Sequence, residues 1–123
     1  MKQRKEEFNM KERKGILESC LGKAQELNSM IDYAADSIVS KTILDKSAGT
    51  ITLFAFDQGQ KLSEHTAKFD AVVQVIDGQG LLTIAGNDVK VAKGQIVIMP
   101  ANVPHAVVAE EKFKMLLTMV REQ

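Results

Sequence analysis

The 123-residue chain has no tryptophan, one tyrosine, one cysteine, two prolines and two histidines. A single cysteine excludes a disulfide within the chain and fits a reducing compartment. The 16 basic and 16 acidic residues balance, so the basic surface of a nucleic-acid-binding protein is missing. No apolar run approaches the roughly 18 residues that span a bilayer. We therefore expect a cytoplasmic protein that binds neither nucleic acid nor membrane.

The N-terminal segment is highly charged and lacks the apolar stretch of a secretory signal. Apolar residues then recur at steps of three and four between Ile16 and Leu27, as on one face of a helix, although Gly15 and Gly22 interrupt the pattern. We expect residues 1–34 to form a helical or irregular arm and residues 35–123 to form a single domain. Met10 is an alternative start residue.

Beyond residue 34, short runs rich in β-branched and aromatic residues alternate with Gly and Asn/Asp turns. This sequence pattern predicts an all-β protein, either an antiparallel sandwich or a barrel. A hairpin turn is expected at Gly78-Gln79-Gly80. The expected strands are residues 37–44, 50–56, 71–76, 81–85, 89–92, 95–99, 106–109 and 113–120.

Several of these runs, including Ile96-Val-Ile-Met99, are apolar at consecutive positions and not at alternate ones. An antiparallel sheet with one wet face would alternate, so the outer face is expected to be covered as well. The cover is the N-terminal arm, a partner subunit, or both. We therefore expect a homodimer with closed two-fold symmetry.

The two histidines each end a segment that begins with glycine. The first segment is Gly59-Gln-Lys-Leu-Ser-Glu-His65, and the second runs from Gly94 through Pro100 and Asn102 to His105. Together they resemble the two sequence motifs of the cupins, which are small β jelly-roll barrels. Asn102 stands where the family usually has glycine, and asparagine also tolerates the positive φ of that turn.

The resemblance implies a metal site at the barrel mouth for zinc, nickel, iron or manganese, but with a depleted set of ligands. Ala67 and Ala71 occupy two of the four usual ligand positions, which leaves His65 and His105. Zinc sites use three or four protein ligands, so two imidazoles alone predict a weak site. Three further residues carry oxygen or nitrogen atoms near the pair, but none is well placed as a third ligand. Glu64 and Gln74 have the wrong strand parity, and Asp70 lies in a loop-like stretch.

The pocket is expected to hold His65 and His105 among apolar side chains, namely Phe69, Val73, Val75, Ile96 and Ile98. Three functions are compatible with such a pocket. The protein could bind a small organic ligand, with or without a weakly held divalent metal. It could be a metal-dependent isomerase or dioxygenase that uses the two histidines, or a structural or regulatory dimer without catalysis. No catalytic residue is assigned, because function resides in the site and not in the fold.

Overall fold

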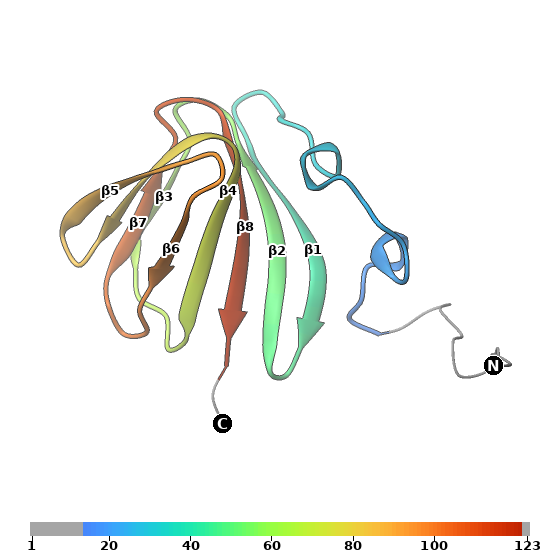
Figure 1. Ribbon diagram of the computed structural model, residues 1–123. Coiled ribbons are helices and arrows are strands. Elements are labelled where there is room, and N and C mark those ends of the chain that lie inside the picture. The colour runs from blue at the N-terminus through green and yellow to red at the C-terminus, as the bar shows by residue number, and fades with distance from the viewer. Residues whose placement is uncertain (1–13, 122–123) are drawn as a thin grey trace, which may run out of the picture.

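The chain folds into a curled antiparallel sheet, shown in Figure 1. The computed structural model describes residues 14–121, so most of the charged N-terminal segment and Met10 lie outside the described part. The all-β prediction is confirmed. The strands are β1 (Ile38–Lys46), β2 (Gly49–Phe56), β3 (Lys61–His65), β4 (Asp70–Ile84), β5 (Asn87–Ala92), β6 (Ile96–Met99), β7 (His105–Val108) and β8 (Phe113–Val120).

The sheet consists of two halves that share β4. In the first half-sheet, residues 70–78 of β4 pair with β8 on one side, and residues 71–74 pair with β6 on the other. β8 continues to β2 and then to β1. In the second half-sheet, residues 79–84 of β4 pair with β5, residues 81–84 pair with β7, and β7 pairs with β3.

The hairpin predicted at Gly78-Gln79-Gly80 is wrong, because β4 runs through these residues without a turn. The glycines instead allow β4 to bend. Gly78 has a φ of 68°, and the ladder with β8 shifts between Val75 and Asp77. A Cβ atom on Gly80 would lie 2.6 Å from the ring of Phe113. Glycine therefore lets the strand pass from one half-sheet to the other and leaves room for an aromatic ring.

Gly78 and Gly86 form a matched pair for testing this bend. Both have positive φ, but a Cβ on Gly78 would collide with the carbonyl oxygen of Lys112, whereas one on Gly86 meets nothing within 4 Å. We expect Gly86→Ala to cost about 1–2 kcal/mol from backbone strain. Gly78→Ala should cost at least roughly 1 kcal/mol more, since the collision is added to the same strain. Urea unfolding measures both, and equal losses would contradict the steric role of Gly78.

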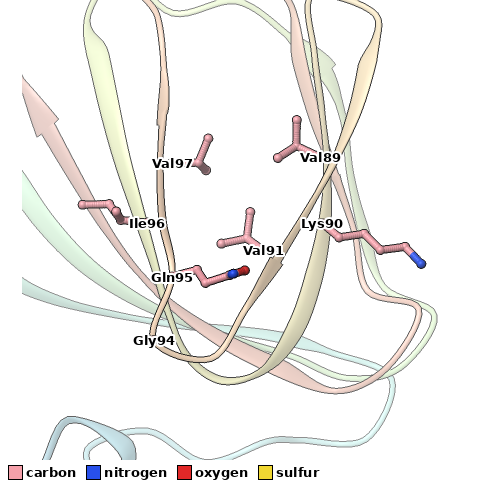
Figure 2. A pocket seen from close by; sticks show the side chains of 7 residues that line it. All are labelled: Val89, Lys90, Val91, Gly94, Gln95, Ile96 and Val97. Carbon is pink, nitrogen blue, oxygen red and sulfur yellow. The ribbon is translucent and has the colours of Figure 1, made fainter.

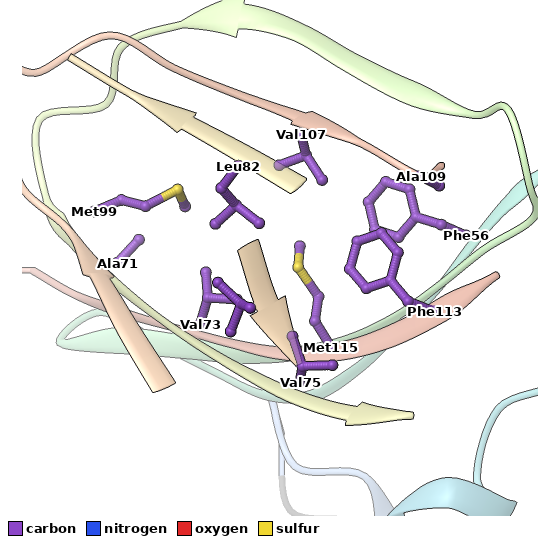
Figure 3. Packing of buried hydrophobic residues seen from close by; sticks show 11 residues of the cluster. Phe56, Ala71, Val73, Val75, Leu82, Met99, Val107, Ala109, Phe113 and Met115 are labelled. Carbon is purple, nitrogen blue, oxygen red and sulfur yellow. The ribbon is translucent and has the colours of Figure 1, made fainter. Parts of the chain in front are cut away.

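The space between the two half-sheets is filled with apolar side chains, as Figure 3 shows. Phe56 and Phe113 stack with ring centroids 4.6 Å apart and planes 8° from parallel. The cluster is built from Phe56, Ala71, Val73, Val75, Leu82, Val91, Met99, Val107, Ala109, Phe113 and Met115. Between the two half-sheets, where this cluster lies, the barrel interior is therefore a packed core and not an open cavity.

Of the two alternatives for the arm, the irregular one is correct. The arm contains two short 3-10 turns, η2 (Glu18–Cys20) and η3 (Leu27–Ser29), and no continuous helix between Ile16 and Leu27. Gly15 and Gly22 adopt φ values of 75° and 69°, which a right-handed helix does not allow. No helix among residues 14–121 is long and apolar enough to cross a membrane.

The arm lies along the outer face and the β1 edge of the first half-sheet (Figure 1). Ile16 bridges to Leu44 on β1. Further along, Ile31 is buried against Leu53 and Ala55, which are fully buried although they point away from the barrel core. The expectation that an apolar outer face needs cover is therefore met here by the arm. The proposed division of the chain at residue 34 stays a prediction.

Polar contacts with β8 and β4 help to fasten the arm. The Lys114 Nζ atom donates to the backbone oxygen of Asn28 at 2.7 Å and to its side-chain oxygen at 3.0 Å. The Tyr33 hydroxyl donates to Asp77 Oδ2 at 2.6 Å. Burial, together with the bond to Asp77 and the charge of that carboxylate, raises the pKa of Tyr33 far above its usual value. The phenol therefore keeps its proton and the bond persists at neutral pH.

Candidate functional site

The structure brings the two histidines together. His65 ends β3, His105 begins β7, and the two residues are partners in the ladder between these strands. Their ring centroids lie 4.3 Å apart with planes at 71°, and the two Nε2 atoms are 3.1 Å apart. Asn102, with a φ of 64°, provides the turn that precedes His105, as the asparagine-for-glycine exchange predicts.

The other nitrogen of each ring fixes the tautomer. His65 Nδ1 lies 2.8 Å from the carbonyl oxygen of Ser63, and His105 Nδ1 lies 3.2 Å from that of Val103. A carbonyl oxygen can only accept, so each Nδ1 carries a hydrogen and donates it. In a neutral ring, the hydrogen on Nδ1 is the only one on nitrogen, so both Nε2 atoms are unprotonated, and they face each other. Two facing lone pairs at this distance repel each other unless a cation, either a shared proton or a metal ion, lies between them.

The two rings differ in exposure. His105 is only 5% exposed, whereas His65 is open to solvent. Burial lowers the pKa of His105, the charge of His65 lowers it further, and the hydrogen bond to Val103 opposes both effects. His105 is therefore predominantly neutral at pH 7, which is the form that can act as a metal ligand.

This lowered pKa predicts how the stability of the fold responds to pH. Below about pH 6.5, the ordinary pKa of histidine, the unfolded chain takes up a proton at residue 105 more readily than the native protein does. The free energy of unfolding should therefore fall as the pH drops through this range towards the native pKa. Replacing His105 with asparagine should flatten that part of the curve. Urea unfolding between about pH 7.5 and pH 5.5 measures it, and parallel curves would contradict the assignment.

In the described part of the chain, no third protein ligand joins the histidine pair. Within residues 14–121 no group of three or more His, Cys, Asp or Glu side chains is placed to hold a metal ion. The Asp70 Oδ1 atom accepts the backbone N–H of Ala101 at 2.8 Å. Glu64 and Gln74 are exposed to solvent, and Ala71 is buried in the core.

The apolar residues expected around the histidines separate into three places. Val73 and Val75 point inward, but they belong to the packed core. Ile96 and Ile98 were expected in the pocket, and this is wrong because they are 61% and 57% exposed. Val97 lies between them and points inward, so strand alternation turns both isoleucines to the outer face. Phe69 lines a separate cavity of about 220 Å³ together with Lys68, Asp70, Ala101, Asn102 and Val120.

The structure also contains a cavity that the sequence did not reveal. It lies between β5 and β6, has a volume of about 430 Å³ and includes neither histidine. Figure 2 shows Val89, Val91 and Val97 pointing into it from the two strands, which diverge from the turn at Gly94. The alternation of valine and lysine in Val89-Lys90-Val91 is the sequence signal that could have indicated it.

A curled antiparallel sheet with a histidine from each of two motifs defines a jelly-roll barrel of the cupin type. Residues 52–121 match the cupin domain family, and the chain belongs to that family. No curated protein matches the chain.

Solved structures support this assignment. A conserved protein of unknown function from Streptococcus pyogenes is 35% identical over 82% of this chain and 89% of its own, with a TM-score of 0.79. A cupin 2 conserved barrel domain protein from Leptotrichia buccalis is 41% identical over 76% of this chain, with a TM-score of 0.75. The match covers 46% of that longer protein. A cupin superfamily protein from Desulfitobacterium hafniense, 22% identical with a TM-score of 0.77, shares the fold.

Proposed function

We propose that this protein is a cytoplasmic cupin that binds a small organic ligand at the histidine pair, with a weakly held divalent metal ion between ligand and protein. The observation that carries the proposal is the convergence of two unprotonated Nε2 atoms, 3.1 Å apart, at the ends of β3 and β7. The single cysteine supports a reducing compartment.

The spacing of the two nitrogens suits a shared metal ion. With metal–nitrogen distances of about 2.0–2.1 Å, nitrogens 3.1 Å apart subtend roughly 100° at the metal. Neutral imidazole is a suitable ligand for zinc, nickel and iron. With two protein ligands, the remaining coordination positions fall to water or to oxygen atoms of an organic ligand. When bound, the metal would act as a Lewis acid and as a template for that ligand.

Metal analysis of protein purified without added metal and without nickel resin tests the proposal. We expect one weakly bound divalent ion per chain on titration with zinc or nickel, and a rise in melting temperature as the ion binds. The double variant His65→Ala/His105→Ala should lose both effects. Glu64→Ala, which removes an exposed neighbouring carboxylate, should keep them. The metal part of the proposal would be overturned if the chain takes up no metal and its melting temperature does not change when divalent ions are added.

Restoring a ligand gives a complementary prediction. Ala67 stands at the position where the family resemblance places a further histidine. Ala67→His should tighten zinc binding about tenfold or more, since a third imidazole brings the site to the number of protein ligands that catalytic zinc sites use. Isothermal titration measures the change. Lys68→His adds an imidazole one residue away and serves as the control. An equal gain in both variants would mean that the new imidazole binds zinc without the histidine pair.

A further inference from the structure

The cavity between β5 and β6 results from the bend of β4. β5 pairs with residues 79–84 of β4, in the second half-sheet, and β6 pairs with residues 71–74, in the first. Because β4 bends between these two stretches, the strands that pair with it diverge from the turn at Gly94 (Figure 2). No ladder joins β5 to β6 within residues 14–121. The cavity is therefore part of the fold, since closing it would break the pairing of one strand with β4.

Backbone hydrogen bonds hold the closed end of the cavity in place. The Gly94 N–H donates to the Val75 oxygen at 2.8 Å, and the Val75 N–H donates to the Gln95 oxygen at 3.1 Å. The Lys93 N–H donates to the Gly78 oxygen at 3.0 Å. These bonds attach the turn between β5 and β6 to the bend of β4. Small-molecule sites are usually formed before the ligand arrives, and a turn that is fixed in this way meets that condition.

The inner lining of the cavity is apolar. Val89 and Val91 lie on one face of β5, and Val97 points towards them from β6 (Figure 2). Val91 is buried in the core and the other two valines pack against it, so the packed core forms the floor of the cavity. Among the described residues that line the cavity, Lys90 alone is charged, and its side chain points away from the valines (Figure 2). A charged ligand would therefore lose hydration here without gaining a counter-ion.

The carboxamide of Gln95 is a polar group at the closed end of the cavity. Figure 2 shows this side chain reaching between the two strands. Its Oε1 atom accepts the backbone N–H of Ala92 at 2.8 Å. Only the amide oxygen can accept this hydrogen, so the contact fixes the orientation of the carboxamide. The Nε2 atom has no acceptor among residues 14–121 in this arrangement, and its hydrogens are available to a ligand.

We propose that the cavity between β5 and β6 is a binding site, separate from the histidine pair, for a neutral small molecule that is mainly hydrocarbon and carries a carbonyl oxygen. The valines bury the hydrocarbon part, and Gln95 Nε2 donates a hydrogen bond to the oxygen. The volume of about 430 Å³ lies within the roughly 300–1,000 Å³ that is usual for small-molecule sites. Such a ligand needs neither histidine and no metal ion, so this site does not depend on the function proposed for the histidine pair.

Fluorescence titration of the full chain with prodan tests the proposal. Prodan is a neutral naphthalene ketone whose emission moves to shorter wavelength in apolar surroundings. The wild-type chain should bind one prodan molecule with this shift. Val89→Phe, which fills the cavity, should weaken binding about tenfold or more. Lys90→Phe places the same ring on the opposite face of β5 and should keep the wild-type affinity. Equal affinities in the two folded variants would overturn the proposal.

Two further comparisons test the chemistry of the ligand. As competitors of similar size, 2-acetylnaphthalene should displace prodan, whereas the charged 2-naphthoate should not do so at the same concentration. Gln95→Glu keeps an oxygen for the Ala92 N–H but removes the donor, and should weaken prodan binding about fivefold or more. Gln74→Glu, the same substitution outside the lining of the cavity, should leave the affinity unchanged. Displacement by both competitors alike, or an equal effect of both glutamates, would contradict the proposed ligand class.

Nuclear magnetic resonance locates the site without any variant, so the test holds even if Val89→Phe fails to fold. Adding 2-acetylnaphthalene to the ¹⁵N-labelled wild-type chain should shift the backbone amide signals of the three valines and the side-chain amide signal of Gln95. The double variant His65→Ala/His105→Ala should bind prodan as the wild type does. The proposal would be overturned by a wild-type chain that does not bind prodan saturably. It would also be overturned by shifts centred on the histidines, or by loss of prodan binding in the histidine double variant.

Discussion

Replacing Phe113 with alanine is expected to lower the free energy of unfolding by about 3–5 kcal/mol, the largest loss we expect from a single substitution in this chain. Phe113 is fully buried, and its ring stacks on Phe56 with centroids 4.6 Å apart. The ring also fills the space beside β4 where Gly80 has no side chain. Alanine would leave a cavity bordered by two rigid strands, and such a site cannot collapse to refill the space.

A loss of this size approaches the total stability of many small domains, which lies at roughly 5–15 kcal/mol. Urea unfolding followed by circular dichroism gives the difference, provided that the variant still folds. If it does not, Phe113→Leu retains more of the volume and should show a loss of about 1–2 kcal/mol. Val120→Ala serves as the control, since Val120 is 50% exposed and its truncation should change the stability by less than about 1 kcal/mol. A loss for Phe113→Ala no larger than that of the control would contradict the proposed packing.

Replacing Lys114 with alanine is expected to release the arm and to cost about 1.5–3 kcal/mol, the usual value of a hydrogen bond that involves a charged group. Lys114 is only 6% exposed. Its ammonium group donates both hydrogen bonds to Asn28 and lies 5.0 Å from the centre of the Tyr33 ring. One side chain of β8 thus holds two points of the arm over the outer face of the sheet.

The release should be visible locally before the whole fold is lost. Hydrogen exchange of the amides around η3 should quicken, and limited proteolysis should cut the arm sooner than in the wild-type chain. Lys112→Ala is the matched control. The Lys112 Nζ atom lies 5.6 Å from the same ring, but this lysine is exposed. Its loss should therefore change the stability by about 1 kcal/mol or less. Equal effects of the two substitutions would show that Lys114 does not fasten the arm.

The sequence predicted the fold class because the strand pattern and the two glycine-to-histidine segments are local signals. Short runs of β-branched residues between glycine turns are sufficient to predict an antiparallel sheet. The turn at Asn102 follows from the residue type alone, and the observed φ of 64° agrees with it. The arm was harder to predict, because apolar residues at steps of three and four are typical of a helix, whereas Gly15 and Gly22 adopt positive φ values that a helix does not allow.

The errors have a shared physical cause. Gly78-Gln79-Gly80 has the composition of a turn, yet here the glycines accommodate a bend and the Phe113 ring, which is distant in the sequence. Ile96 and Ile98 are as hydrophobic as Val97 between them, so composition could not say which side of β6 faces the core. The register with β4 decides it, because Ile98 pairs with the half-buried Val72 of the outer face, and Val97 pairs with the fully buried Val73.

By itself, the sequence determined the family of the barrel and the identity of its two histidines, and through the family resemblance it predicts that Ala67 and Ala71 stand at two of the usual ligand positions. These are properties of residue type and spacing, which a linear chain displays directly. The tertiary structure decided that the two Nε2 atoms face each other 3.1 Å apart, that the arm is fastened to Lys114, and that β6 presents two isoleucines to solvent. Each of these depends on contacts between residues distant in the chain, which are fixed only when the strands pair.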